Sequence, residues 1–410
     1  MATATAKRNE RQREQRLGIT AKSIAPPVDE KLQENRRNRF KYQTVSSKIL
    51  AKDAEKKLQK TSTKKYAGDI HRTCDCAWTV VASRVSVKKS PEFKTAHYKG
   101  LATCGSVWSC PVCTAKIQER RRVEIADAMN QHYDLGGQVM MVTLTAPHYN
   151  HQKLEDLRAM QREALFKFRN GSGAFKRMLD AQGYKGLIRS LEVTVSQRNG
   201  WHLHTHELWF VDKKADIEKI RKRALERWEK ACFKAGLLNA FDEKQVKAFR
   251  KHSVDIKGFV SCSEYLAKMD DQQHWGADRE IAKSSTKKGK KKGLHPFGLL
   301  AEVEENTDKA AWAEKRFLEY CLTMKGSRQL FWSHGLKKHF GIGEKTDEEL
   351  AAMEESELID VIEIDRPTWK VIRENGARST VLEIAELNDK RALDLFINAQ
   401  KRMSLEPPDE

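Results

Sequence analysis

Apolar residues recur along the chain with two different periods, which predict a mixture of strands and helices. The run VMMVTLTAP mixes β-branched and apolar residues over 138–145 and stops at Pro147, as a strand would. Two more segments, 187–195 and 201–210, alternate in polarity around the turn sequence RNG at 198–200. Asn-Gly between two such segments is a strong signal for a β-hairpin, so an antiparallel sheet is expected.

Helical periodicity marks longer segments between and after these strands. The predicted helices are 115–134, 152–181, 215–235, 259–269 and 308–324. The C-terminal part also has a helical pattern, and no internal repeat is found. Helices that flank an antiparallel hairpin favour an α+β fold.

Changes in composition divide the chain into four parts. Residues 1–65 hold 18 basic and 7 acidic side chains with few aromatics, which favours a mobile or loosely helical basic arm. Residues 66–120 contain most of the cysteines and form a cysteine module. Residues 121–345 form the main domain, with the low-complexity basic run KSSTKKGKKKG at 283–293 as a surface loop. Residues 346–410 form an acidic helical segment, a separate small domain or an oligomerisation element.

The charge of the chain is unevenly distributed and points to a polyanionic partner. Residues 347–410 carry 17 acidic and 8 basic side chains, net −9, and the remainder carries 68 basic and 40 acidic, net +28. Such a basic body suits DNA, and phosphate contacts would make the binding strongly salt-dependent. The alternative is a solvated surface that keeps the protein in solution.

Length and hydropathy bound the class of protein. A chain of 410 residues with 39% hydrophobic side chains can bury the cores of two or three domains. No stretch approaches the roughly 18 uninterrupted apolar residues of a membrane span, and no apolar segment follows the basic N-terminus. We therefore expect a cytoplasmic protein without membrane contact.

Five of the eight cysteines crowd into the cysteine module, which favours metal over disulfides in such a chain. Cys104, Cys110 and Cys113 form C-x₅-C-x₂-C, and its CPVC turn suits zinc held by two thiolates. A structural Zn²⁺ would stabilise a small DNA-contacting platform, with Cys76 as our choice of fourth ligand. The alternative is that reduced cysteines pack as small hydrophobic residues. The other candidates for the fourth ligand are Cys74, His71 and His97.

Three histidines alternate on one predicted strand. His202, His204 and His206 in NGWHLHTHELWF are two residues apart, so their imidazoles project from one face of the strand. Three imidazoles on one face can bind a divalent ion and leave positions open, where the ion acts as a Lewis acid on a phosphate. The alternative is that these histidines pair at the surface or have partners in the core.

Glu192 is the carboxylate best placed to complete this site, provided that the hairpin register allows it. A two-residue loop at 199–200 would pair Glu192 with Glu207, on the face opposite the histidines. A three-residue loop would pair it with His206 and put it on the histidine face. We expect the longer loop. Thr143 and Thr145 on the neighbouring strand would pack or fix the geometry of the site.

Tyr265 lies on the predicted helix 259–269, with Lys268 one turn further on. A phenol is a weak nucleophile near neutral pH and needs a nearby cation or a metal-polarised phosphate, and Lys268 could supply that charge. Taken alone, the pattern YxxK is usually interpreted as a half-buried tyrosine beside a lysine that extends to solvent, without a catalytic role. The histidine strand upstream and the basic chain favour a functional pair.

The TLT strand at 143–145, the GWHLHTH segment at 200–206 and the YLAK helix at 265–268 resemble, in this order, the three motifs of the HUH endonucleases. In particular they resemble the replication initiators of small rolling-circle plasmids. The segments CGSVWSCPVC, LHPFGLL and EYCLTMKGSRQLFWSHGLK extend the likeness over about 103–341. We see none in residues 1–65 or beyond about 345.

The resemblance implies a five-stranded antiparallel sheet with flanking helices in an endonuclease domain. His204 and His206 match the two metal-binding histidines, and His202 matches a frequent additional one. Tyr265 matches the nucleophile and Lys268 the lysine that follows it. Such proteins nick an origin hairpin, form a 5′-phosphotyrosine and free a 3′-OH that primes synthesis.

The chain departs from the family pattern in having a single tyrosine. Some relatives place a glutamate one turn before it, where this chain has Ser261. Glu264 would point about 100° away from Tyr265 on a helix. The termination route therefore stays open.

The expected ligands are single-stranded or hairpin origin DNA, Mg²⁺ or Mn²⁺ at the histidine site, and Zn²⁺ at the cysteines. A host helicase and polymerase, a homodimer and a bacterial cytoplasm are further expectations. One alternative is a transposase or relaxase with the same chemistry. Another is a non-catalytic, zinc-containing DNA-binding regulator.

Overall fold

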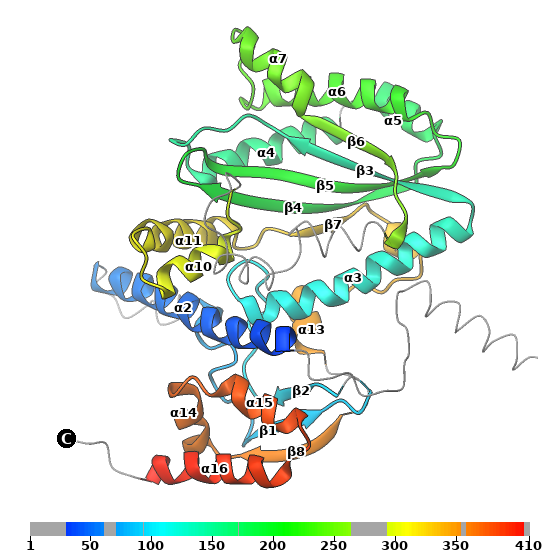
Figure 1. The fold of residues 1–410 in the computed structure, drawn as a ribbon. Coiled ribbons are helices and arrows are strands. Elements are labelled where there is room, and N and C mark those ends of the chain that lie inside the picture. The colour runs from blue at the N-terminus through cyan, green and yellow to red at the C-terminus, as the bar shows by residue number, and fades with distance from the viewer. Residues whose placement is uncertain are drawn as a thin grey trace, which may run out of the picture.

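The computed structural model combines two antiparallel sheets with helices that connect and cover them (Figure 1). Among its described helices, none has the length and apolar character needed to cross a bilayer. The structure describes residues 30–60, 71–92, 94–170, 172–263, 293–353 and 358–405.

The larger sheet has five strands in the order β6-β3-β5-β4-β7, and every neighbouring pair is antiparallel. The α+β class and the five-stranded antiparallel sheet are therefore confirmed. The three strands predicted from alternation, β3, β4 and β5, lie within two residues of their expected bounds. The strands are β3 (Gly137–Thr145), β4 (Gly186–Ser196), β5 (Gly200–Asp212), β6 (Val254–Phe259) and β7 (Leu330–Trp332).

We predicted a helix over 259–269, and the start of this prediction is wrong. Phe259 ends strand β6 and pairs with Met140 of β3, so the backbone there is extended. Strand β6 has only six residues, VDIKGF, and only the first four alternate between apolar and polar, which is a short signal. Residues 264–269 of the predicted helix lie outside the described residues.

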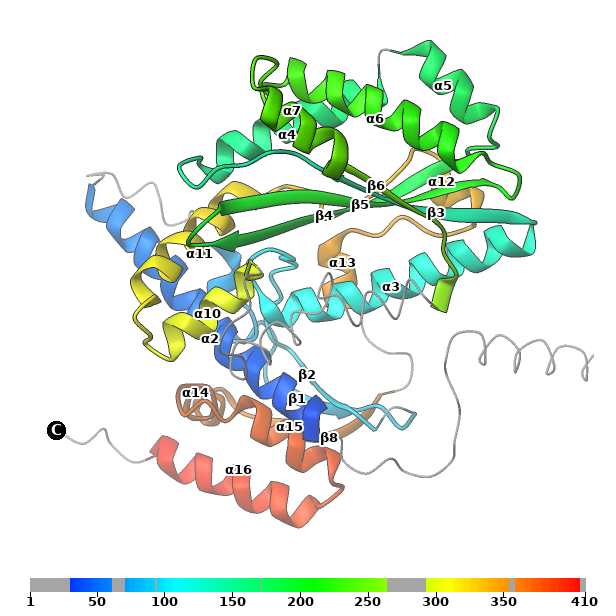
Figure 2. The same ribbon diagram turned by 45° about the horizontal axis from the view of Figure 1, so that its top comes forward.

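Helices cover both faces of this sheet. Four of them, α4 to α7, lie on one face, and α3 runs along the other (Figure 2). We call these the α4 face and the α3 face. Their bounds are α3 (Pro111–Asp134), α4 (Leu154–Arg169), α5 (Gly173–Asp180), α6 (Ile217–Lys234) and α7 (Glu243–His252).

The two faces differ because side chains alternate along each strand. On the α4 face, Trp209 of β5 packs against Phe168 of α4, which also contacts Trp228 of α6. On the α3 face, Leu208 and Phe210 form a core with α3. Toward the N-terminal end of β5, the positions on this same face are occupied by histidines instead of apolar residues.

The smaller sheet joins the cysteine module to the C-terminal segment. Its order is β2-β1-β8, so a strand of the C-terminal segment pairs with a hairpin of the cysteine module. Residues 346–410 are therefore not a separate domain, and they contain a strand as well as helices. The elements are β1 (Val85–Lys89), β2 (Ala96–Lys99), β8 (Ile359–Ile364), α14 (Arg366–Glu374), α15 (Arg378–Glu386) and α16 (Lys390–Leu405).

Helix α2 (Glu30–Lys60) occupies much of the predicted basic arm. Its buried residues include Tyr42, Val45 and Ile49, which belong to the main hydrophobic core, so a mobile arm is wrong for this part. A weak helical periodicity within a strongly basic sequence concealed this apolar face. The remaining elements are η2 (Arg72–Cys74), α10 (Pro296–Glu304), α11 (Ala310–Met324), α12 (Leu336–His339) and α13 (Asp347–Ala352).

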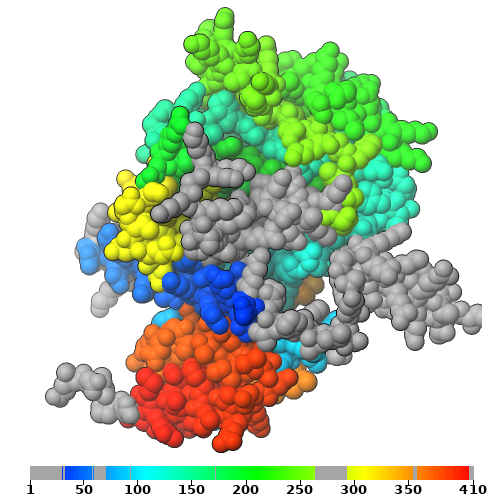
Figure 3. All heavy atoms as spheres, viewed as in Figure 1, coloured from blue at the N-terminus to red at the C-terminus, as the bar shows by residue number. Residues whose placement is uncertain are grey.

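Acidic residues of the C-terminal segment neutralise basic residues of α2. Arg36 donates two hydrogen bonds to Glu386, and Arg37 donates two to Glu383. Figure 3 shows the C-terminal region, in orange and red, packed directly against the blue N-terminal helix. The opposite net charges of the two ends therefore pair, at least in part, within one molecule.

Arg378 at the start of α15 lies at the centre of this contact and is 1% exposed. It donates hydrogen bonds to Gln43 Oε1 at 2.9 Å and to Ala77 O at 3.0 Å. It also donates to Phe40 O at 3.0 Å and to Thr44 Oγ1 at 2.7 Å. The guanidinium of Arg378 thus donates hydrogen bonds to two backbone carbonyls.

We expect Arg378→Met to lower the free energy of unfolding by about 3–5 kcal/mol, because it leaves buried carbonyls without donors. Urea denaturation followed by circular dichroism measures the change. Arg391→Met, on the exposed side of α16, is the control and should change stability by less than about 0.5 kcal/mol. Equal stability of the two variants would contradict this role of Arg378.

Candidate active site and metal centres

The register of the β4–β5 hairpin decides which side chains share a face. Ser196 pairs with Gly200, so the loop has three residues, 197–199, as expected. The turn begins one residue earlier than expected, and Glu192 therefore lies opposite His204 instead of His206. Gly200 has φ +72, and a Cβ there would come within 2.7 Å of the Cα of Asn150, so this turn requires glycine.

Glu192, His204 and His206 converge on the α3 face. Glu192 Oε2 lies 2.8 Å from His204 Nε2 and 3.1 Å from His206 Nε2. The side chains are 7% exposed for the glutamate and 12% for each histidine, so the group is recessed but open to solvent. Their ligand atoms all lie within 4.8 Å of one another.

This donor set fits a divalent cation. Neighbouring ligands of an octahedral ion with bonds of about 2.0–2.1 Å lie about 3 Å apart, as the Glu192–histidine distances do. One carboxylate and two imidazoles leave coordination positions open for water or a phosphate. Imidazole favours Mn²⁺ or a softer metal over Mg²⁺.

Thr143 of β3 orients one of the histidines. Its Oγ1 lies 3.0 Å from His206 Nδ1, on the side of the ring away from Glu192. A partner on the second ring nitrogen fixes the orientation of an imidazole ligand. Thr143 lies opposite His206 and Thr145 opposite His204 in the β3–β5 register, so both threonines border the site.

His202 lies beside this group but outside it. Its ring stacks on His148 at 4.4 Å, and its buried Nε2 has no hydrogen-bond partner among the described residues. Burial, followed by the charges of His204 and His148, lowers the pKa of His202 to about 3, so the ring is neutral at physiological pH. Of the four expected ligands of the divalent ion, Glu192, His204 and His206 lie together, and His202 lies beside them.

An open cavity of about 400 Å³ begins at His148, next to the histidine row. The loop after β3 forms one wall and α7 forms the other. Sequence reasoning missed this cavity, since its two walls are about 100 residues apart in the chain. The lining residues include Thr145, His148, Tyr149, Gln245, Phe249 and His252.

The expected nucleophile and its lysine, Tyr265 and Lys268, lie outside the described residues. The chain before them is anchored on the α3 face: Val260 N–H donates to Val139 O at 2.9 Å, and Cys262 is buried in the core beneath α3. The last described residues before Tyr265 therefore lie on the face that carries the histidines. Most of the basic loop 283–293 also lies outside the described residues.

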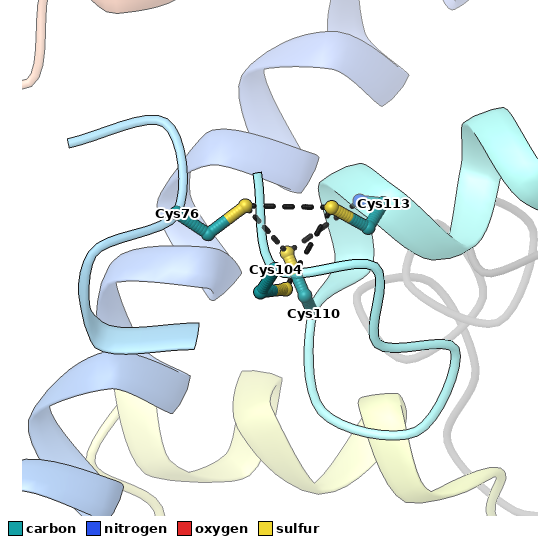
Figure 4. A group of neighbouring side chains, drawn as sticks. All are labelled: Cys76, Cys104, Cys110 and Cys113. Carbon is teal, nitrogen blue, oxygen red and sulfur yellow. Dashed lines mark hydrogen bonds between the residues drawn. The ribbon is translucent and has the colours of Figure 1, made fainter. Parts of the chain in front are cut away.

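Four cysteines meet in a second, fully buried group (Figure 4). Cys76 follows the short helix η2, Cys104 lies in the loop between β2 and α3, and Cys110 and Cys113 lie at the start of α3. The Sγ–Sγ distances are 3.4 Å for Cys76–Cys113, 3.6 Å for Cys76–Cys110 and 3.7 Å for Cys104–Cys113. The structure thus brings together the three cysteines of the motif and our choice of fourth.

These distances fit a tetrahedral zinc site, in which Zn–S bonds of about 2.3 Å place the sulfurs about 3.8 Å apart. The other candidates are engaged elsewhere. Cys74 Sγ lies 3.6 Å from Ser47 O, and His71 Nδ1 accepts a hydrogen bond from the N–H of Thr73. His97 Nε2 lies 3.0 Å from Thr95 Oγ1 on the smaller sheet.

A family model described as "Replication protein" matches residues 99–368, more than half of the chain. The match extends beyond residue 345, where we saw no likeness in the sequence, and includes strand β8. Residues 359–364 carry no motif that we recognised, so their relation to the family came only from the family model.

Two curated proteins are similar to parts of the chain. "Protein rep" of Streptomyces lividans is 29% identical over 310 residues, which cover 60% of this chain and 66% of that protein. "Neomycin resistance protein" of Streptomyces cyanogenus is 29% identical over 170 residues, 33% of this chain and 39% of that protein. The chain spans less than two thirds of the length of each relative. No solved structure matches it significantly.

We expect the purified protein to contain one zinc ion and to lose it in Cys110→Ser. Loss of the ion should lower the free energy of unfolding on the order of 4 kcal/mol, because four buried sulfurs lose their common partner. Elemental analysis and thermal unfolding measure the two effects. Cys74→Ser is the matched control and should keep its zinc; loss of zinc in that variant instead of Cys110→Ser would contradict the assignment.

Substitutions along the histidine row should separate ligands from neighbours. His204→Ala and Glu192→Gln should weaken Mn²⁺ binding at least about 10-fold, since each removes a donor atom. His202→Ala should change the affinity by less than about threefold, because its ring faces His148. Isothermal titration calorimetry gives these affinities, and an equal loss in all three variants would show that His202 is also a ligand.

Proposed function

The chain belongs to the replication protein family, and we propose that it initiates rolling-circle replication of a plasmid by nicking one DNA strand. The observation that carries this proposal is the group Glu192, His204 and His206 on the central strands of a five-stranded antiparallel sheet. This is the arrangement expected of an HUH-type endonuclease. The net charge of +19 suits a DNA substrate.

The residues of this group would bind and position the scissile phosphate. A Mg²⁺ or Mn²⁺ ion held there would supply Lewis-acid chemistry on that phosphate. Glu192 contributes the negative charge that retains a divalent cation, and Thr143 holds the ring of His206 in its orientation. The recessed position of all three side chains limits access of water to the phosphate.

Tyr265 is the proposed nucleophile. Its phenolic oxygen forms a bond to phosphorus while the bond from phosphorus to the 3′ oxygen breaks. The phenol loses its proton and the departing oxygen gains one, so the products are a 5′-phosphotyrosine and a free 3′-OH. Lys268, one turn further on a helix, would stabilise the phenolate. The anchoring of Cys262 on the α3 face supports this arrangement.

The cavity at His148 would accept an unstacked base of the DNA beside the scissile phosphate. Tyr149 and Phe249 offer aromatic surfaces, and stacking on such surfaces is a common way to bind single-stranded DNA. The stack of His148 on His202 places the cavity next to the metal-binding group. Base identity at this position would therefore contribute to the choice of nick site.

The remaining parts of the chain would support this reaction. Zn²⁺ at the four cysteines would fix the start of α3, the helix that covers the α3 face. A host polymerase would extend the free 3′-OH, and a host helicase would separate the strands ahead of it. Origin DNA in single-stranded or hairpin form is the proposed substrate, and a homodimer is the proposed assembly.

Covalent capture tests the proposed function. Single-stranded oligonucleotides that tile the replicon are incubated with the protein and Mn²⁺, and we expect one of them to yield a 5′-linked adduct that survives denaturing electrophoresis. Tyr265→Phe and chelation should each abolish the adduct, because they remove the nucleophile and the metal.

Tyr184→Phe, on the α4 face, is the matched control and should form the adduct normally. DNA that is retarded but uncut would favour the non-catalytic regulator. An adduct formed only with the ends of a mobile element would favour a transposase.

A further inference from the structure

Arginines gather around Phe331 on the α4 face, behind the metal-binding group. The guanidinium of Arg189 lies 5.1 Å from the centre of the Phe331 ring, and that of Arg169 lies 6.0 Å from it. Arg189 pairs with Phe331 on one side and with Glu207 on the other in the sheet register. Because Ser190 is opposite His206, this cluster and the histidines lie back to back on the same strands.

The positive charge of the cluster exceeds the negative charge beside it. Glu207 is fully buried and forms an ion pair with Arg169. The same carboxylate also accepts hydrogen bonds from Trp209 Nε1 at 2.9 Å and Thr205 Oγ1 at 3.3 Å. One carboxylate therefore serves an arginine and two neutral donors.

Two further arginines belong to this region, and neither forms an ion pair with another described residue. The charges of Arg158 on α4 and Arg328 before β7 act on Arg189, together with that of Arg169. Burial, followed by the charge of Arg169, lowers the pKa of Arg189 to about 10. A phosphate bound among these guanidinium groups would offset both their burial and their mutual repulsion.

Several N–H groups of the cluster have no acceptor among the described residues. These are Nε of Arg158, Arg169 and Arg189, and Nη1 of Arg158. A buried N–H without an acceptor is costly, and a phosphate oxygen could serve as the acceptor for these groups. By contrast, Arg36 and Arg37 of α2 each contact a glutamate of α15.

We propose that Arg158, Arg169, Arg189 and Arg328 form a second phosphate-binding site on the α4 face, separate from the metal centre. The planar guanidinium groups suit the oxygens of a phosphate, and Phe331 offers a surface for an adjoining base. β7 is the edge strand of the sheet, so a DNA strand that passes around this edge would reach the site from the α3 face. The phosphate belongs either to such a strand or to a free phosphate-bearing molecule.

Inorganic phosphate is the first probe, compared with chloride at equal ionic strength and without added divalent metal. Wild-type protein should melt about 2–4 °C higher in phosphate, and Arg189→Met should lose most of this increment. Phosphate also stabilises proteins by exclusion, so the control Arg223→Met is needed. Arg223 lies on α6, paired with Glu226 at 3.0 Å, and its variant should respond as wild type does.

The melting temperature in chloride separates binding from a structural role. Arg189→Met should melt no lower than wild type there, because it removes like-charge repulsion and keeps most of the side-chain volume. A lower melting temperature combined with an unchanged phosphate increment would overturn the proposal.

Single-stranded DNA distinguishes the two sources of phosphate. Fluorescence anisotropy is measured over a salt series in the Tyr265→Phe background, so the result does not depend on nicking. If the site binds the DNA backbone, Arg189→Met should weaken binding about 10-fold and reduce the salt slope by about one, whereas Arg223→Met should not. Loss of the phosphate increment with unchanged DNA affinity would assign the site to a free phosphate-bearing molecule.

Discussion

The alternation of side chains along β4 and β5, fixed by the three-residue loop between them, is the constraint on which the site depends. With Ser196 opposite Gly200, Glu192 shares a face with His204 and His206. A shift of one residue would move the carboxylate to the α4 face, where Glu207 already lies against Arg169. The same register that forms the metal-binding group therefore keeps the acidic and basic groups of the two faces apart.

Local sequence patterns predicted those parts of the structure that local geometry determines. The hairpin, the shared face of the histidines and the grouping of Cys104, Cys110 and Cys113 follow from spacing, and the structure has them. Spacing left Cys74 and Cys76 both open as the fourth cysteine, and the tertiary fold brings Cys76 to the group. The structure differs from the predictions where contacts between distant segments determine the conformation. The apolar side of α2 is visible only with its neighbours in place, and Ile359–Ile364 becomes a strand because β1 offers an edge. The cavity at His148 combines segments far apart in the chain, so no local signal marks it.

The two ends of the chain stabilise the region that carries the cysteines. α2 packs against the cysteine region and, through Arg36 and Arg37, against α15. β8 completes the sheet that begins with β1 and β2. The acidic C-terminal segment thus compensates part of the basic charge of α2.

We have proposed that one carboxylate and two imidazoles on the α3 face bind a divalent ion. A crystal structure of the Mn²⁺-loaded protein, with anomalous diffraction at the manganese edge, would locate that ion. We expect a single anomalous peak within bonding distance of Glu192 Oε2, His204 Nε2 and His206 Nε2. A peak between His148 and His202, or none on this face at saturating Mn²⁺, would contradict it.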